Sequence, residues 1–116
     1  MAEETIKLKD DPKEPVLRFA PNPNGPLTLG HARGVVVNHY LARKYGGKFI
    51  LRFDDTDPRT KRPLVDAYDW IQEDCAWLGA KPDEVVRASD NIGTYYDHAL
   101  KLIDMGHAYT CTCERE

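Results

Sequence analysis

Short apolar runs recur along the chain and are separated by longer stretches with a different pattern. The runs are rich in β-branched and aromatic residues, which favour strands. They are bounded by proline, glycine, asparagine or aspartate, which end regular structure. The predicted strands are Val16–Ala20, Lys48–Phe53, Asp83–Ala88 and Ala108–Thr112.

The first stretch between strands has helical spacing and begins at Leu29. Apolar residues three and four positions apart form one face of a helix, so that face is expected to be buried. Gly46 and Gly47 follow the pattern and predict its end, because glycine commonly terminates helices. The expected buried face consists of Leu29, Ala32, Val36 and Tyr40, with Val37 and Leu41 beside it.

Two further helices are predicted in the same way. One starts near Pro63 and ends at Gly79, and the other is capped by Ser89 or Asp90 and ends at Gly106. The apolar stripe of the second helix is Leu64, Tyr68, Ile71, Cys75 and Leu78, and that of the third is Ile92, Tyr95, Ala99 and Leu102. Cys75 is therefore expected in the core.

The elements alternate in the order β-α-β-α-β-α-β. This alternation predicts an α/β fold with a mainly parallel sheet and right-handed crossovers. Ligands of such sheets bind beyond the carboxyl ends of the strands. The loops Pro21–Thr28 and Asp54–Pro58 both follow strands, so we expect them to face one crevice.

Composition and charge exclude several classes of protein. The 116 residues are 41% hydrophobic and 30% charged, as in globular domains. The net charge of −3 argues against a free-standing nucleic-acid binder, which is usually basic. No apolar run approaches the roughly 18–20 residues of a membrane helix, and residues 1–14 are polar, which predicts a flexible leader and a cytoplasmic protein.

The segment from Pro26 to Arg33 passes from a proline-rich loop into the first helix. The N–H groups at a helix start attract phosphate, and Gly30 lets a ligand approach the backbone. His31 can donate a hydrogen bond to a phosphate oxygen as charge builds up. An ordinary helix start, with Thr28 as the N-cap and His31 on the surface, explains the same residues.

The run Arg18–Arg33 (RFAPNPNGPLTLGHAR) resembles the amino-terminal signature of glutamyl-tRNA synthetases, which are class I enzymes. Leu51–Asp57 (LRFDDTD) and Trp77–Gly79 are similar to two further segments of that family, in its archaeal form. The resemblance implies a Rossmann-like (HUP-type) domain, with residues 15–116 forming the amino-terminal half of the catalytic, nucleotide-binding domain. It also implies a ligase of protein biosynthesis that joins glutamate to tRNA(Glu) with ATP and Mg²⁺.

Site residues are carried over from the resemblance position by position. The substrate glutamate is expected at Arg18, Ala20, Asn22 and Asp54, with Arg18 on a carboxylate and Asp54 on the ammonium group. ATP is expected at Asn24, Gly25, Thr28, Gly30 and His31, of which Thr28, Gly30 and His31 also serve catalysis. Thr28 replaces the first histidine of the family signature, so its hydroxyl either takes over that role or leaves it weakened.

Parts of the family pattern are missing from this sequence. Cys111 and Cys113 supply only half of a four-ligand zinc site, so we expect no bound Zn²⁺. The Lys-Met-Ser-Lys-Ser loop and the tRNA-binding regions are absent, which suggests a truncated fragment whose contact with tRNA is weak or lost.

Three alternatives stay open. The chain is similar to glutaminyl-tRNA synthetases or to enzymes that glutamylate another acceptor, although Ala20 favours glutamate. It could also be a catalytically silent binding or folding module. Whether the exposed face of a half-domain associates with a second copy is not determined by the sequence.

Overall fold

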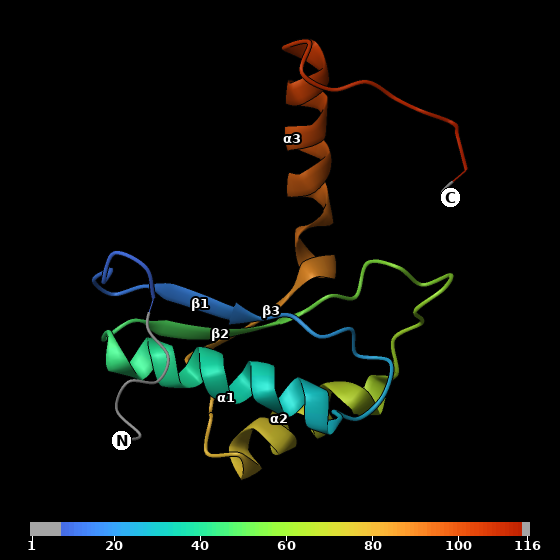
Figure 1. Ribbon diagram of the computed structural model, residues 1–116. Helices are drawn as coiled ribbons and strands as arrows, with labels where there is room; N and C mark the ends of the chain where they lie inside the picture. The colour runs from blue at the N-terminus through green and yellow to red at the C-terminus, as the bar shows by residue number, and fades with distance from the viewer. Residues whose placement is uncertain (1–7, 115–116) are drawn as a thin grey trace.

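The computed structural model describes residues 8–114 and places a small parallel sheet against two helices, with a third helix standing away from it (Figure 1). Residues 1–7 of the predicted leader lie outside the described part. The elements in chain order are β1 (Val16–Phe19), α1 (Leu29–Lys44), β2 (Lys48–Phe53), α2 (Val65–Trp77), β3 (Glu84–Arg87), the 3-10 turn η1 (Ala88–Asn91) and α3 (Ile92–Asp104).

The sheet has the order β1-β2-β3, and both pairs of strands are parallel. The predicted α/β class with a Rossmann-like parallel sheet is confirmed. The predicted fourth strand is not: residues 108–112 carry no regular structure. A strand needs a neighbour that pairs with its backbone, and this segment follows α3, which leads the chain away from the sheet (Figure 1).

The core lies on one face of the sheet, which we call the inner face. Phe49, Leu51 and Phe53 of β2 are fully buried there. They form one cluster with Val35 and Ala42 of α1 and with Ile71 and Cys75 of α2. Both helices lie on this side of the sheet (Figure 1). Burial of each large side chain contributes roughly 1.5–3 kcal/mol, so this cluster is the main source of stability.

The predicted buried face of α1 is largely wrong. Leu41 is buried as expected, together with Val35 and Ala42, whereas Leu29 is 89% exposed and Val36 and Tyr40 are also exposed. The side facing the sheet is set by Gly34, where an added Cβ would lie 3.4 Å from the Phe19 ring. A glycine thus marks the face that approaches the strand, and the apolar pattern did not include it.

α2 matches its prediction more closely, although it begins at Val65 and not at Pro63. Ile71 and Cys75 are fully buried, and Tyr68 and Leu78 pack partly against the core. Burial raises the pKa of the Cys75 thiol to about 11, so it behaves as an apolar core residue. Leu64, which we expected on the buried stripe, is 46% exposed and precedes the helix.

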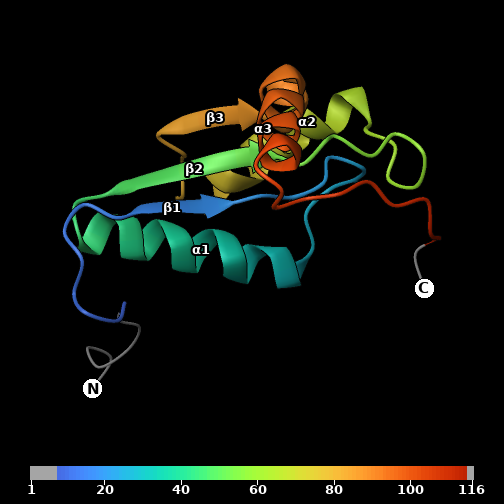
Figure 2. The ribbon, with the colours of Figure 1, turned by 90° about the horizontal axis from the view of Figure 1, so that it is seen from above.

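α3 contradicts its prediction in two respects. Its N-cap is Asn91, not Ser89 or Asp90, because η1 occupies those positions. Its apolar stripe is not buried: none of its residues is buried. α3 rises from the sheet on the side opposite α1 (Figure 1) and is seen nearly end-on from above (Figure 2). No element among residues 8–114 packs along its length.

The turn between α1 and β2 also holds the segment that precedes β1. Lys48 N–H donates to Pro15 O at 3.0 Å, and Glu14 N–H donates to Tyr45 O at 3.1 Å. A Cβ at Gly47 would lie 1.9 Å from Pro15 O, so only glycine allows this approach. Gly46 has a φ of 68° instead, which glycine adopts without strain.

Candidate active site

The two loops that we expected to share a crevice are hydrogen-bonded to each other. Asp54 N–H donates to Pro21 O at 2.9 Å. The Asn22 side-chain Nδ2 donates to the backbone O of Asp54, also at 2.9 Å. Each loop follows a strand, β1 or β2, and parallel strands bring their carboxyl ends to the same edge of the sheet. The expected convergence of the loops is confirmed.

Arg18 lies on the open face of the sheet, opposite the core. Its neighbours Leu17 and Phe19 pack against the core, and side chains alternate along a strand. Arg18 pairs with Ile50 in the register of β1 and β2, and it is exposed. Its guanidinium is therefore accessible to a carboxylate on this face.

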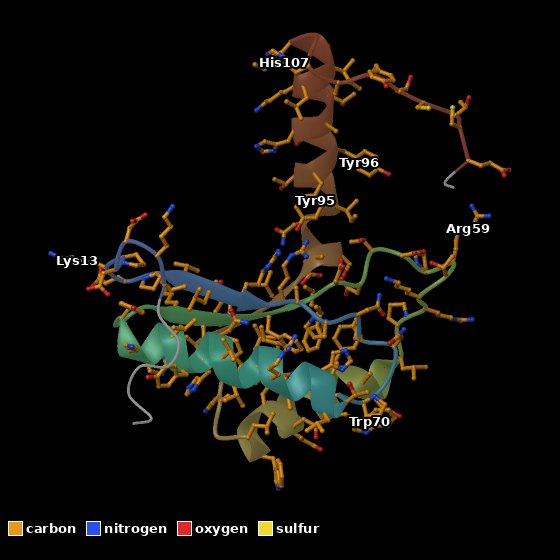
Figure 3. All side chains as sticks on the ribbon, viewed as in Figure 1. Lys13, Arg59, Trp70, Tyr95, Tyr96 and His107 are labelled. Carbon is orange, nitrogen blue, oxygen red and sulfur yellow. The ribbon has the colours of Figure 1, made fainter. Side chains whose placement is uncertain are left out.

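Asp54 stands just beyond the end of β2 with its side chain 54% exposed. The Arg52 Nη1 lies 3.9 Å from its Oδ1, a loose ion pair. Arg52 Nη2 also donates to the hydroxyl of Tyr95, at 3.3 Å, at the base of α3 (Figure 3). Arg52 was not among the residues predicted for the site, but it is the cationic neighbour of Asp54. The sequence could have indicated this contact, because residues two positions apart in a strand lie on the same side of it.

At the start of α1, Thr28 is the N-cap as predicted. Its backbone N–H donates to His31 Nδ1 at 3.0 Å, and its Oγ1 lies 3.1 Å from the same nitrogen. The His31 ring also meets the edge of Phe19, with centroids 6.3 Å apart. Because Nδ1 accepts a hydrogen bond, the neutral ring carries its proton on Nε2, which leaves Nε2–H as an outward donor.

Gly25 and Gly30 face open space. A Cβ at Gly25 would meet nothing within 4 Å, and one at Gly30 would meet only Thr28 Oγ1, at 3.8 Å. Internal packing therefore does not require glycine at either position. A hollow of about 690 Å³ lies against the first turns of α1 and is lined by Leu29, Gly30, Ala32, Arg33 and Val36.

The remaining predicted residues of the first loop differ in accessibility. Ala20 and Asn22 are half-buried, and Asn24 is exposed. The amide of Asn22 is engaged by Asp54 through Nδ2, and its Oδ1 is buried without a hydrogen-bond partner. Asn22 therefore joins the two loops, a role that the sequence did not indicate.

Asp55, directly after Asp54, is the buried charged residue of the described chain. It accepts hydrogen bonds from Ser89 N–H at 2.8 Å, Ser89 Oγ at 2.7 Å and the Tyr68 hydroxyl at 2.7 Å. Burial opposes ionisation, but these hydrogen bonds outweigh it and lower the pKa of Asp55. Burial together with the Asp55 contact raises the pKa of Tyr68 to about 12.

Cys111 and Cys113 are exposed, and Cys113 N–H lies 3.4 Å from Cys111 Sγ. Within residues 8–114 no group of three or more histidine, cysteine or acidic side chains is arranged to hold a metal ion. The same part of the chain contains no helix that is both long and apolar enough to span a bilayer.

Comparison with known proteins gives a consistent result. Residues 15–116 match the sequence profile described as tRNA synthetases class I (E and Q), catalytic domain. The glutamate–tRNA ligase of Methanococcoides burtonii is 69% identical over 99 residues, which cover 85% of this chain and 17% of the relative. That of Archaeoglobus fulgidus is 65% identical over 101 residues, covering 87% and 18%.

A solved structure extends the likeness to the fold. The crystal structure of a glutamate–tRNA synthetase from Elizabethkingia anophelis superposes with a TM-score of 0.73 at 33% identity, covering 79% of this chain and 20% of that one. The chain thus spans about a fifth or less of the length of these relatives. The match over residues 15–116 establishes that the chain belongs to the class I tRNA synthetase family for E and Q, within its catalytic domain.

Proposed function

We propose that this chain supplies the amino-acid and ATP-binding part of a glutamate–tRNA ligase. The parent reaction joins glutamate and ATP into glutamyl-adenylate and pyrophosphate, and the glutamyl group then passes to tRNA(Glu). The observation that carries the proposal is the pair of hydrogen bonds that joins the Pro21–Asn22 loop to Asp54. It brings an acidic group to the same edge of the sheet as the start of α1. The names of the relatives favour glutamate over glutamine.

In this proposal Arg18 and Asp54 orient glutamate. The Arg18 guanidinium matches a carboxylate as a planar two-pronged donor, and Asp54 offers a half-exposed carboxylate to the ammonium group. Ala20 and Asn22 would border the same glutamate-binding position. Arg52 lies close enough to Asp54 to restrain its side chain and to compete with a bound ammonium group.

ATP would lie along the first loop and the start of α1. The residues proposed to contact ATP are Asn24, Gly25, Thr28, Gly30 and His31. The two glycines leave room for a ligand against the backbone. The Nε2–H of His31 and the free N–H groups of the helix start would stabilise charge on the phosphates. Because Thr28 holds Nδ1 of His31, it would fix the direction of that donor.

The reaction requires orientation and charge stabilisation, with the glutamate carboxylate as the nucleophile. Mg²⁺ would be held mainly by the phosphates, since the described residues offer no protein cluster for it. Cys111 and Cys113 provide two ligands where structural zinc takes four, so Zn²⁺ is not included. Binding of tRNA(Glu), a cytoplasmic location and the division into a leader and a half-domain remain part of the proposal.

The test is an NMR titration of the chain with a non-hydrolysable glutamyl-adenylate analogue, with the glutaminyl analogue as the control ligand. We expect saturable shifts at Arg18, Gly30, His31 and Asp54 that are stronger for the glutamyl compound. Arg18→Ala should weaken binding by about 10- to 100-fold, the worth of a charged hydrogen bond. The affinity of Arg18→Lys should fall between that of the original chain and that of Arg18→Ala, because lysine keeps the charge and loses the planar guanidinium.

Lys48→Ala is the matched control, since Lys48 is an exposed cation at the other end of the sheet, opposite Val16. It should leave binding unchanged. A folded spectrum without shifts, or equal binding by Arg18→Ala, would contradict the proposed site.

A further inference from the structure

Asp54 and Asp55 are adjacent and chemically identical, but their side chains have opposite surroundings. Asp54 is half-exposed, whereas Asp55 is 9% exposed. The three hydrogen bonds described above for Asp55 come from segments distant in sequence, namely from Tyr68 on α2 and from Ser89 on η1. Asp55 thus ties the end of β2 to α2 and to the segment that follows β3.

The backbone between these two side chains is held from the other direction as well. Asp54 N–H donates to Pro21 O, and Asp54 O accepts from Asn22 Nδ2. The backbone at Asp54 is therefore held in two ways. Its own N–H and C=O groups bind the first loop, and the side chain of the next residue, Asp55, binds α2 and η1. Rotation of this segment would have to break hydrogen bonds of a buried charged group, which are costly to lose.

We propose that Asp55 is a positioning residue of the ligand site: it fixes the direction of the Asp54 carboxylate and, through Asn22, the first loop. Asp55 does not touch the ligand itself. The inference rests on the proposed function, in which Asp54 receives the ammonium group of glutamate. It assigns a role in orientation to a side chain that a purely structural account would treat as a clamp between β2, α2 and η1.

The chain contains a matched control for that structural account. Asp83 also accepts three hydrogen bonds, two from Arg43 at 2.9 Å each and one from Phe49 N–H at 2.8 Å. It precedes β3 and pairs with the beginning of β2, so it lies at the opposite end of the sheet from Asp54. A variant at Asp83 loses a comparable carboxylate and leaves the ligand end intact.

The experiment compares Asp55→Asn with Asp83→Asn by hydrogen exchange of the Asp54 amide in the free chain. Rates are compared at urea concentrations that give both variants the same free energy of unfolding. The inference predicts that exchange at Asp54 rises about tenfold more in Asp55→Asn than in Asp83→Asn, because a local restraint is lost. Equal exchange in the two variants would overturn it.

Ser89→Ala and Ser89→Thr provide a gentler pair in case Asp55→Asn fails to fold. Ser89→Ala removes one hydroxyl donor and should raise exchange at Asp54 by about threefold. Ser89→Thr restores the hydroxyl and should return the rate towards that of the original chain. An alanine variant that exchanges at the original rate would contradict the inference.

Ligand binding separates this inference from the proposed function. If the original chain binds the glutamyl-adenylate analogue, Asp55→Asn should bind about tenfold more weakly and Asp83→Asn equally well. Equal binding by Asp55→Asn would overturn the positioning role while leaving the proposed function in place. If the original chain does not bind, the proposed function of the chain fails, and the exchange rates at Asp54 alone decide the positioning role.

Discussion

α3 and the rest of the molecule differ in a way that their sequence patterns do not suggest. α3 has a sharper separation of apolar and polar residues than either α1 or α2. Nevertheless α1 and α2 bury residues against the sheet, and α3 buries none. An amphipathic pattern therefore shows which face a helix is able to bury. It does not show that the same chain contains a surface that covers this face.

The difference has an energetic side. The sheet with α1 and α2, which we call the body, shares one cluster of buried side chains and should unfold cooperatively. α3 has 13 residues, and isolated helices shorter than roughly 12–15 residues are marginal in water. α3 should therefore open more readily than the body. The predictions that follow test this contrast, beginning with the largest expected effect.

Leu51→Ala should lower the free energy of unfolding of the body by about 3–4 kcal/mol, because it leaves a cavity at a fully buried position. Leu102→Ala is the same substitution on α3, where Leu102 is 47% exposed, and it should cost less than about 1 kcal/mol. Urea denaturation followed by tryptophan fluorescence measures both. Similar losses in the two variants would show that α3 is part of the cooperative unit.

Ala99→Pro should disrupt α3 locally, since proline inside a helix costs about 3 kcal/mol. The far-UV circular dichroism signal should lose helix while the urea midpoint of the body stays unchanged. Glu73→Pro, at an exposed position of α2, is the control and should lower that midpoint. A lower urea midpoint in Ala99→Pro would contradict this prediction and show that α3 and the body unfold as one cooperative unit.

Acid should weaken the body through its paired carboxylates. The Arg43 guanidinium and the Phe49 N–H lower the pKa of Asp83 to about 2, and the pKa of Asp55 is also depressed. Groups with a lowered folded pKa stabilise above their unfolded pKa of about 3.9, and this contribution is lost as the pH falls towards the folded value. Urea midpoints should therefore decline between about pH 4 and pH 2.

Asp83→Asn should flatten part of this decline, as it removes one of the titrating groups. The effect is modest because the Asp83 side chain is 34% exposed and its ion pair is screened by salt. A decline of unchanged steepness in Asp83→Asn would place the acid-sensitive groups elsewhere.

Trp77→Phe should have the smallest effect, within about 0.5 kcal/mol, even though Trp77 belongs to the body. Its side chain is 86% exposed, so little contact is lost. Trp70→Phe on the same helix (Figure 3) is the comparison. The Trp70 side chain is less exposed, at 41%. A large loss in Trp77→Phe would mean that exposure in the structure does not report stability in this helix.

The sequence predicted the elements well where local chemistry determines them. Strand β2 places Phe49, Leu51 and Phe53 at alternate positions, as suits a strand with one buried face. Each helix ends two residues before a glycine with positive φ, namely Gly46, Gly79 and Gly106. The orientation of α1 could not be predicted in this way. Val35, Val36 and Val37 are equally apolar, and the contact of Gly34 with Phe19 depends on the packed structure.

The candidate site shows the same distinction between features set by local sequence and features set by distant residues. Thr28 as the N-cap and the meeting of the two loops followed from turn chemistry and strand order. The contrast between Asp54 and Asp55 did not, since it comes from donors distant in sequence, Tyr68 and Ser89, of which Ser89 lies 34 residues further along the chain. The predicted strand at residues 108–112 depends on a pairing partner, which no local pattern provides. The predicted ligand contacts remain predictions.

The two glycines after α1 differ in how much sequence variation each permits. Gly46 is selected by its backbone angle, and asparagine tolerates that region, so substitution there is graded. Gly47 is selected by space, because any Cβ would collide with Pro15 O. Neutral drift or a designed library can therefore explore position 46, whereas position 47 permits essentially one residue for as long as Pro15 stays docked on the turn.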